Sequence, residues 1–194
     1  MTVLVVGGSG ETGRLLVRQL LDRGLRVRAI VRSPEKFIQA VGAKERLSLV
    51  HAAVLDLSDA ELARHVAECE PVASCLGHTL SFKGVYGMPR RLVSDATRRL
   101  CEATKANEPK SPVKFALMSS TGCRNRDLAE SISFAERCVV GLIRLLVPPH
   151  SDNEEAAEYL RSHIGSDDAG VEWVAVRPDS LVDEEVVTKY EIHA

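Results

Sequence analysis

The sequence predicts an α/β fold: a doubly wound parallel sheet with helices on both faces, in a single domain of 194 residues. Two observations predict it. Short apolar runs alternate with segments of helical periodicity along the chain, and the first apolar run leads directly into a cluster of glycines. Strands that are separated by helices pair in parallel, because each crossover returns the chain to the same end of the sheet. The expected strand order is 3-2-1-4-5-6, with a ligand crevice outside the carboxyl ends of the strands.

The first strand, turn and helix form the most informative part of the chain. Residues 3–6 are an apolar strand, and apolar side chains recur at helical spacing after Gly13. The turn between them presents backbone N–H groups at the positive end of a helix, which favours phosphate. Gly7 permits the sharp turn, Gly10 lets a pyrophosphate approach the backbone, and Gly13 lets the helix pack closely. The other contacts expected from this loop come from Ser9, Glu11 and Thr12.

A glycine-rich turn that binds no ligand is the alternative interpretation of this motif. A P-loop is excluded, because no Gly-Lys-Ser/Thr sequence closes the turn. A second apolar strand at residues 27–31 follows the first helix. That context favours dinucleotide binding.

The remaining elements follow from periodicity and from the residues that begin and end helices. After the second strand we expect a short helix at 34–42 and a third strand at 47–54. Ser58 is the expected N-cap of a helix over 59–68. The later expected elements are a strand at 71–76, a helix at 89–107, a strand at 113–118, helices at 131–147 and 152–162, and a strand at 171–176.

The end of the second strand predicts which cofactor is bound. An enzyme that uses NAD usually presents an acid here to the ribose 2′-hydroxyl. This chain has Arg32 and Ser33 instead, which can pair with a 2′-phosphate through a guanidinium and a hydroxyl. The alternative is an ordinary surface arginine. We expect NADP rather than NAD.

The ends of the third and fourth strands supply further candidates. Asp56 and Leu57 could bracket the adenine, with the carboxylate accepting from its amino group; alternatively Asp56 only opens the next turn. After the fourth strand, the chain is expected to pass close to the middle of the cofactor, where a glycine leaves room. The residues at that place are Cys75, Leu76 and Gly77.

The last two strand ends lie where a nicotinamide and a substrate would meet. Ser119 and Ser120 follow the fifth strand, and Ser120 is the candidate catalytic hydroxyl donor to a substrate oxygen. A serine pair after a strand is also a common turn. Arg177 and Pro178 follow the sixth strand and could flank the nicotinamide, or the strand could simply end at the proline.

Taken together, these motifs resemble the atypical short-chain dehydrogenase/reductases, in particular the NAD(P)H-binding branch that includes NmrA-like proteins and the biliverdin-IXβ and flavin reductases. The resemblance covers nearly the whole chain. It implies a Rossmann domain that binds NADP(H) and, for some members, reduces flavins, quinones or small carbonyl compounds. The residues that carry it are the glycine turn at 7–13, Val31-Arg32, Asp56-Leu57, Cys75-Leu76-Gly77, Ser119-Ser120 and Val176-Arg177-Pro178.

The chain departs from that family at its catalytic pair. Typical members carry Tyr-x-x-x-Lys, in which the lysine lowers the pKa of the tyrosine that donates a proton. Here Tyr159 is followed at that spacing by His163, and the place where extended relatives have a lysine, ahead of Ala157 and Glu158, holds Glu154. Ser120 or solvent must supply the proton, or there is no chemistry. Reduction of a flavin needs positioning more than acid catalysis.

Composition excludes several other classes of function. The net charge of −2 gives no reason to expect a nucleic acid or an anionic membrane as partner. Five cysteines without a CxxC motif, with six scattered histidines, fit neither a disulfide framework nor a metal site, and suggest reduced cytoplasmic thiols. No signal peptide or membrane span is expected. The chain ends without a closing element, which leaves open that a C-terminal segment is missing. The oligomeric state is not indicated.

Two hypotheses follow from the sequence. The first is an NADPH-dependent oxidoreductase that acts on a flavin, a quinone or a small carbonyl compound. The second is a non-catalytic NADP(H)-binding protein that senses redox state and engages a protein partner. The loss of the tyrosine–lysine pair favours the second, whereas the strand-end residues near the expected nicotinamide favour the first.

Overall fold

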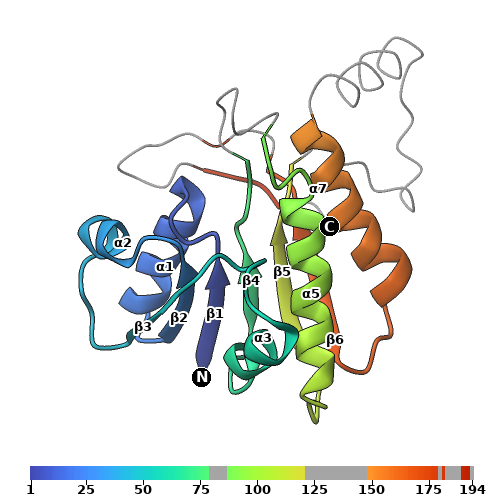
Figure 1. Cartoon of the computed structure of the whole chain (residues 1–194), viewed down its shortest axis with the longest axis horizontal. Helices are drawn as coiled ribbons and strands as arrows, with labels where there is room; N and C mark the ends of the chain where they lie inside the picture. Colours follow the sequence, from blue (N-terminus) through green and yellow to red (C-terminus); the bar gives the residue numbers. More distant parts are fainter. Residues whose placement is uncertain (79–86, 121–147, 179–180, 182–188, 193–194) are drawn as a thin grey trace.

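The computed structural model describes residues 1–78, 87–120, 148–178, 181 and 189–192. Its centre is a sheet of six parallel strands in the order β3-β2-β1-β4-β5-β6, which confirms the predicted order. Because all the strands run in one direction, their carboxyl ends lie along one edge, which is at the top of Figure 1. The strands are β1 (Thr2–Val6), β2 (Arg26–Val31), β3 (Leu47–His51), β4 (Val72–Ser74), β5 (Val113–Met118) and β6 (Val171–Val176).

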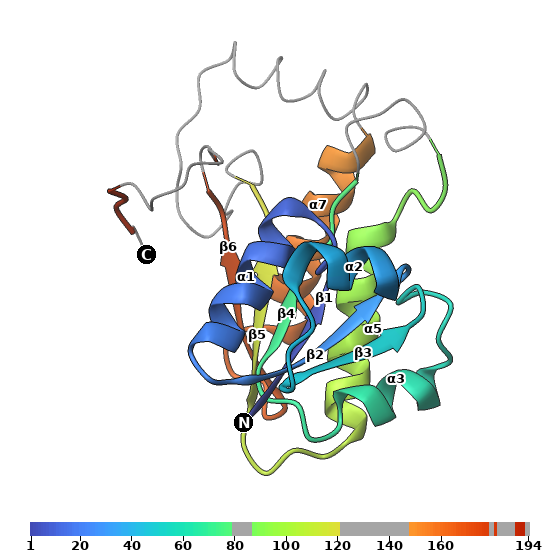
Figure 2. The same cartoon turned by 90° about the vertical axis from the view of Figure 1, so that its left-hand side faces the viewer.

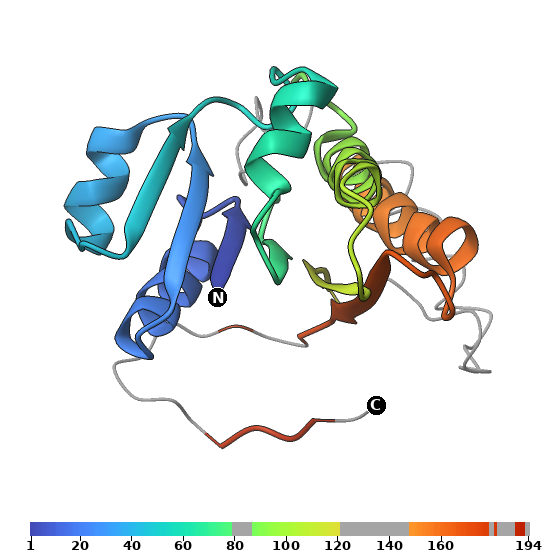
Figure 3. The same cartoon turned by 90° about the horizontal axis from the view of Figure 1, so that it is seen from below.

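Helices cover both faces of the sheet. Helices α1 (Glu11–Asp22) and α2 (Pro34–Val41) pack on one face and lie in front of the strands in Figure 2. The opposite face is covered by α3 (Asp59–Val66), α5 (Leu92–Ala106) and α7 (Pro148–Tyr159), which continues into the π-helical turn η1 (Leu160–Ile164). Figure 3 shows α3, α5 and α7 on one side of the sheet and α1 on the other. The arrangement is the predicted doubly wound one.

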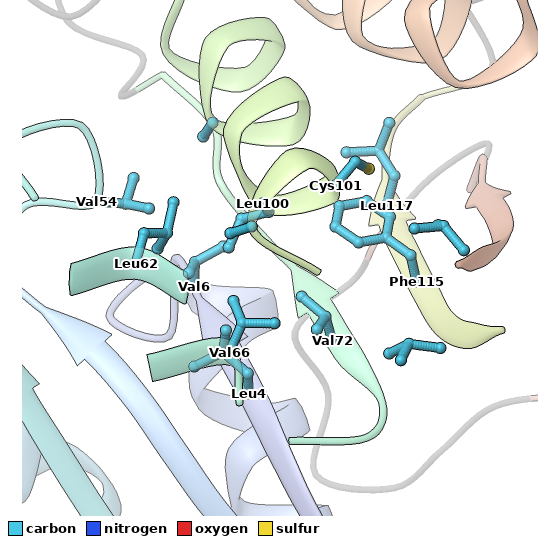
Figure 4. Close-up of a cluster of buried hydrophobic side chains, with 14 of the residues drawn as sticks. Leu4, Val6, Val54, Leu62, Val66, Val72, Leu100, Cys101, Phe115 and Leu117 are labelled. Carbon is cyan, nitrogen blue, oxygen red and sulfur yellow. The ribbon is translucent and has the colours of Figure 1, made fainter. Parts of the chain in front are cut away.

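The larger hydrophobic core lies between the sheet and helices α3, α5 and α7. Figure 4 shows Val6 and Val72 of the sheet close to Leu62 of α3 and Leu100 of α5. All four side chains are buried. Full burial of one such side chain contributes about 1.5–3 kcal/mol, so this layer holds α5 firmly on the sheet. Helix α5 therefore holds a fixed position relative to the carboxyl ends of the strands.

Several predicted boundaries are corrected by the structure. The third strand ends at His51 and not at residue 54, because the chain turns there and Val54 reaches the core from a turn. The fourth strand covers only residues 72–74. The first helix begins at Glu11, so Gly13 lies inside its first turn. The helix expected over 152–162 begins at Pro148, because the first turn of a helix tolerates proline.

The predicted N-cap of α3 is confirmed. Ser58 Oγ accepts a hydrogen bond from the backbone N–H of Glu61, and Glu61 Oε2 accepts one from the backbone N–H of Ser58 at 2.9 Å. Ser58 Oγ also donates a hydrogen bond to Glu61 Oε2 at 2.7 Å, and this bond, together with the one from the Ser58 backbone N–H, lowers the pKa of Glu61. The helix expected over 131–147 lies outside the described residues. Among the helices that the structure describes, none is both long enough and apolar enough to cross a membrane.

Candidate functional site

A cleft of about 730 Å³ lies outside the carboxyl ends of the strands. Residues from the ends of β1, β2, β4 and β5 line it, together with the first turn of α1, the segment 52–56 and Asn153 of α7. Val6, Ile30 and Met118 give it an apolar floor. This is the position that the sequence predicted for a ligand crevice.

The glycine turn at one wall of the cleft is built from two kinds of glycine. Gly7 has a φ of +73°, and a Cβ on it would lie 2.4 Å from the carbonyl carbon of Cys75. A Cβ on Gly13 would lie 2.2 Å from the carbonyl oxygen of Gly7. A Cβ on Gly10 would meet only Gly7 O, at an ordinary 3.4 Å. The protein itself therefore requires glycine at Gly7 and Gly13 but not at Gly10.

Gly10 is also the N-cap of α1, and its side of the turn faces the cleft. No side chain caps this helix. The C=O of Gly10 accepts a hydrogen bond from the N–H of Arg14 at 2.9 Å. The first N–H groups of any helix have no partner within the helix, so this end suits an anion. Ser9, Glu11 and Thr12 line the cleft beside it.

At the β2 end of the cleft the structure brings together only part of the predicted set. Arg32 and Asp56 line the cleft, and His51 Nε2 lies 3.1 Å from the carbonyl oxygen of Arg32. Ser33 is the N-cap of α2 and is not among the lining residues. Leu57 packs against the core, and its carbonyl oxygen accepts a hydrogen bond from Arg99. The segment 52–55, which the sequence analysis places largely in a strand, forms this wall instead.

At the other end, the β4 and β5 termini face the cleft. Cys75, Leu76 and Gly77 line it, and a Cβ on Gly77 would meet no atom within 4 Å. Burial raises the pKa of Cys75 to about 11, so its thiol is protonated at neutral pH and is a poor nucleophile. Because a Cβ on Gly77 would meet no atom, the backbone there is open to a ligand, as expected from the sequence.

The serine pair after β5 divides between two positions. Ser119 lines the cleft, and its Oγ is buried without a hydrogen-bond partner. Ser120 is not among the lining residues. Arg177 and Pro178 follow β6 and are not lining residues either. The serine that lines the cleft with an unpartnered hydroxyl is therefore Ser119, one residue before the predicted Ser120.

A buried polar network that the sequence does not predict connects the cleft to α5 and α7. His78 lines the cleft, and its Nε2 lies 2.8 Å from Asp152 Oδ2 of α7. Asp152 also accepts hydrogen bonds from the backbone N–H groups of Val93 and Ser94 at 2.8 and 2.9 Å, and from Ser94 Oγ at 2.6 Å. No local signal could have found it, because the partners are 58–74 residues apart in sequence.

Two pairs of residues in the C-terminal helix have the four-residue spacing of a Tyr-x-x-x-Lys motif. Tyr159 and His163 stack with ring centroids 5.1 Å apart, and Tyr159 packs against the core. Burial raises the pKa of Tyr159 to about 12, so it is a weak acid at this position. The second pair is His150 and Glu154, with Nε2 and Oε1 3.5 Å apart. Within the described ranges, no group of three histidine, cysteine or acidic residues could hold a metal ion.

The residues present fit a dinucleotide. The turn at Gly10 leaves space at a helix N-terminus, the backbone is open at Gly77, and the unpartnered Ser119 Oγ lies at the far end. Phosphates, a ribose and a carboxamide are the groups that such donors bind. The cleft would hold the cofactor with its pyrophosphate against α1.

Comparison with known proteins agrees with this fit. Three solved structures are similar in fold: the oxidoreductase YlbE of Lactococcus lactis (18% identity, TM-score 0.65), the UDP-glucuronic acid 4-epimerase of Bacillus cereus in complex with UDP-glucuronic acid and NAD (18%, 0.64), and the enzyme WbmH of Bordetella bronchiseptica in complex with NAD⁺ (16%, 0.66). The matches cover 95%, 91% and 97% of this chain, and 72%, 56% and 58% of those chains, respectively.

No curated protein sequence matches the chain. The NAD(P)H-binding family profile, in contrast, matches residues 7–194, from the first glycine of the turn to the last residue. The match begins at Gly7, and the turn that begins there also lines the cleft. The chain therefore belongs to the NAD(P)H-binding family, and its fold is similar to that of the three solved structures.

Proposed function

We propose that this protein is an NADPH-dependent oxidoreductase that reduces a flavin, a quinone or a small carbonyl compound. The observation that supports it best is the cleft itself, which extends from Arg32 past the glycine turn to Ser119. A dinucleotide along this path would bring its nicotinamide to the Ser119 end, beside the apolar Met118. Bound NADPH would supply the hydride, and the chain would position the acceptor and exclude water.

Arg32 supports NADP over NAD. It lines the cleft after β2, and Asp56 is the only acidic residue near this end among the lining residues. A guanidinium matches a phosphate through charge-assisted hydrogen bonds. We propose that Arg32 reads the 2′-phosphate.

Replacement of Arg32 tests this assignment. Arg32→Ala should weaken NADP binding by about 1.5–3 kcal/mol, the value of hydrogen bonds to a charged group, and change NAD binding little. Calorimetry with both cofactors measures this. Arg26→Ala is a matched control, because Arg26 is exposed at the opposite end of the same strand. Equal losses for both cofactors would show that Arg32 does not read the phosphate.

The hydroxyls after β5 are the proposed contacts to a substrate oxygen. Ser120 is the assignment from sequence, and Ser119 is the serine that lines the cleft with an unpartnered Oγ. Each donor to a developing oxyanion typically contributes 10²–10³-fold in rate. We expect Ser119→Ala to lower kcat for a carbonyl acceptor by about that factor.

Ser120→Ala in the same assay decides between the two. A large loss in Ser120→Ala and none in Ser119→Ala would return the role to Ser120. If neither variant loses activity, positioning of the acceptor is sufficient for catalysis.

An acceptor panel tests the function as a whole. NADPH oxidation would be followed with FMN, dichlorophenolindophenol, several quinones and small aldehydes. Turnover with any of them supports the oxidoreductase. Tight binding of NADPH without turnover would favour the second candidate, a non-catalytic NADP(H) sensor, which is supported by the position of Tyr159 against the core.

The proposed setting is the cytoplasm, with a small molecule as substrate and neither nucleic acid nor membrane as partner. The cysteines that the structure describes, Cys69, Cys75 and Cys101, are all free, which suits a reducing compartment.

A further inference from the structure

A single arginine of α5 contacts the segment that forms the wall of the cleft after β3. Residues 52–56 of this segment line the cleft, as does Leu92, the first residue of α5. Arg99 lies two turns after Leu92, and residues at this spacing share one face of a helix. Arg99 is not among the lining residues. It therefore contacts the wall from α5, on the side away from the cleft.

The Arg99 guanidinium donates a hydrogen bond through each of its five N–H groups. Three of them go to backbone carbonyls. Nη1 donates to Val54 O at 3.4 Å and to Leu55 O at 3.0 Å, and Nη2 donates to Leu57 O. The other two go to Asp59 Oδ1, at 3.1 Å from Nε and 2.7 Å from Nη2. The planar fork of an arginine holds several acceptors in one geometry, which a lysine ammonium cannot do.

The turn that Arg99 contacts is also fixed on its core side. The N–H of Asp56 donates to Ala53 O at 3.0 Å, which closes the turn. Val54 is 6% exposed and lies near Leu62 of α3 in Figure 4. The orientation of the turn is thus set by contacts outside the cleft, and its cleft side is in place before a ligand binds.

The carbonyl contacts of Arg99 matter more than its ion pair. The Arg99 side chain is only 14% exposed, whereas that of Asp59 is 90% exposed. An ion pair with such an exposed carboxylate contributes little, because water and salt screen it. Backbone carbonyls that a side chain covers, in contrast, need a donor within the protein. We therefore expect the effect of Arg99 to act through the backbone of the turn.

We propose that Arg99 is a positioning residue for the cofactor: it holds the carbonyls of Val54, Leu55 and Leu57, and thereby the wall against which the adenosine end of the dinucleotide binds. The inference rests on the proposed placement of the cofactor, with its 2′-phosphate at Arg32. A preformed wall binds more tightly, because binding does not have to order it. Adenosine is common to NAD and NADP, so Arg99 serves both cofactors, in contrast to Arg32.

Arg99→Lys is the most informative variant. It keeps the positive charge and can still pair with Asp59, but one ammonium cannot also hold three carbonyls. Calorimetry should show that the dissociation constants for NADP⁺ and NAD⁺ both rise about tenfold, which corresponds to about 1.4 kcal/mol. Arg99→Ala should lose at least as much affinity for each cofactor.

Two control variants separate the carbonyl contacts from charge and from the ion pair. Arg98→Ala removes an exposed arginine of the same helix, which pairs with Glu102 at 3.3 Å. Asp59→Asn removes the ion pair and leaves the carbonyl contacts of Arg99. Both should bind NADP⁺ and NAD⁺ as wild type does. A loss in Asp59→Asn equal to that in Arg99→Lys would overturn the proposal.

Two further readouts distinguish positioning from a general loss of structure. Unfolding would weaken binding tenfold only if about nine-tenths of the ligand-free chains were unfolded. Circular dichroism of Arg99→Lys should instead show the secondary structure of wild type. Amide hydrogen exchange should accelerate more at Asp56, whose N–H closes the turn, than at the buried Val5 of β1. Equal acceleration at both amides would mark a general loss of stability and would overturn the proposal.

Failure of the proposed function is distinguishable from failure of this inference. If wild type binds neither NADP⁺ nor NAD⁺, the proposed function fails and the role of Arg99 fails with it. If wild type binds both cofactors and Arg99→Lys binds them equally well, only the role of Arg99 is overturned. A loss confined to NADP⁺ would also overturn it, because the effect would then lie at the 2′-phosphate.

Discussion

The glycines of the turn after β1 are constrained in two different ways. Gly7 and Gly13 are excluded from carrying a side chain by the protein itself, through Cys75 and through the carbonyl of Gly7. Gly10 has no such constraint. Because Gly10 also lines the cleft, the space beside it is available to a ligand.

Two alanine substitutions separate these constraints. Gly13→Ala adds a methyl 2.2 Å from Gly7 O and should lower the free energy of unfolding by about 1–3 kcal/mol or more. Gly10→Ala should fold normally but bind NADP at least about tenfold more weakly, a loss of about 1.4 kcal/mol. Urea denaturation and calorimetry measure the two effects. Normal NADP affinity in Gly10→Ala would contradict a phosphate cradle at this turn.

For single residues, the sequence predicts which residues line the cleft better than it predicts the residues that they contact. Gly7, Gly10, Arg32 and Asp56 line the cleft and were predictable because the segments that follow parallel strands share one edge of the sheet. Between Ser119 and Ser120 the sequence cannot choose, because the residue that faces the cleft depends on how β5 ends. Asp152 carries no local signal, since its surroundings come from α5 and from the segment after β4.

At the scale of elements, apolar runs predicted all six strands, and the bounds of β5 and β6 are as predicted, whereas β3 and β4 are shorter than predicted. The run after β3 continues through Ala52 and Ala53 to Val54, yet the strand stops at His51. Val54 is buried from a turn, and apolar character alone does not separate a buried turn from a strand. Helix α7 was predicted to start late because proline usually ends a helix, whereas its first turn accepts one. That difference brings His150 onto the helix.

Asp152 joins α7 to the start of α5. Its carboxylate accepts from the second and third residues of α5, in the place of a side-chain cap that α5 lacks. It also holds His78 at the cleft. The helix that carries Asn153 and the segment that carries Gly77 are thereby tied to a common support.

Removal of this carboxylate should be costly. Asp152→Ala leaves His78 and two backbone N–H groups without their partner in a buried region, and we expect unfolding to become easier by about 3–5 kcal/mol. Ser94→Ala, which removes one hydroxyl contact, should cost about 1 kcal/mol. Chemical denaturation measures both. A loss below about 1 kcal/mol for Asp152→Ala would show that the network does not hold α5 and α7 together.

For the whole molecule, the doubly wound arrangement decides where chemistry can occur. Packed side chains fill both faces of the sheet, so the edge at the strand carboxyl ends is where backbone groups and polar side chains meet a cleft. Strand order and helix placement were predictable from the alternation of elements. The volume of the cleft and its apolar floor were not, because they arise from residues spread between Val6 and Asn153.

The same packing gives the fold a dependence on alkaline pH. Burial raises the pKa of Cys101 to about 12 and that of Cys75 to about 11, from an ordinary 9.0, and raises that of Tyr159 to about 12 from 10.0. A raised pKa in the folded state means that the fold favours the protonated form. That stabilisation is complete below about pH 9 and is lost as pH rises from there toward 12. The urea concentration at the unfolding midpoint should therefore decrease between pH 9 and pH 11.

Tyr159→Phe should flatten the upper part of this decline, whereas Tyr190→Phe should not, because Tyr190 is 73% exposed. Equal slopes in both variants would place the alkaline loss in groups other than Tyr159.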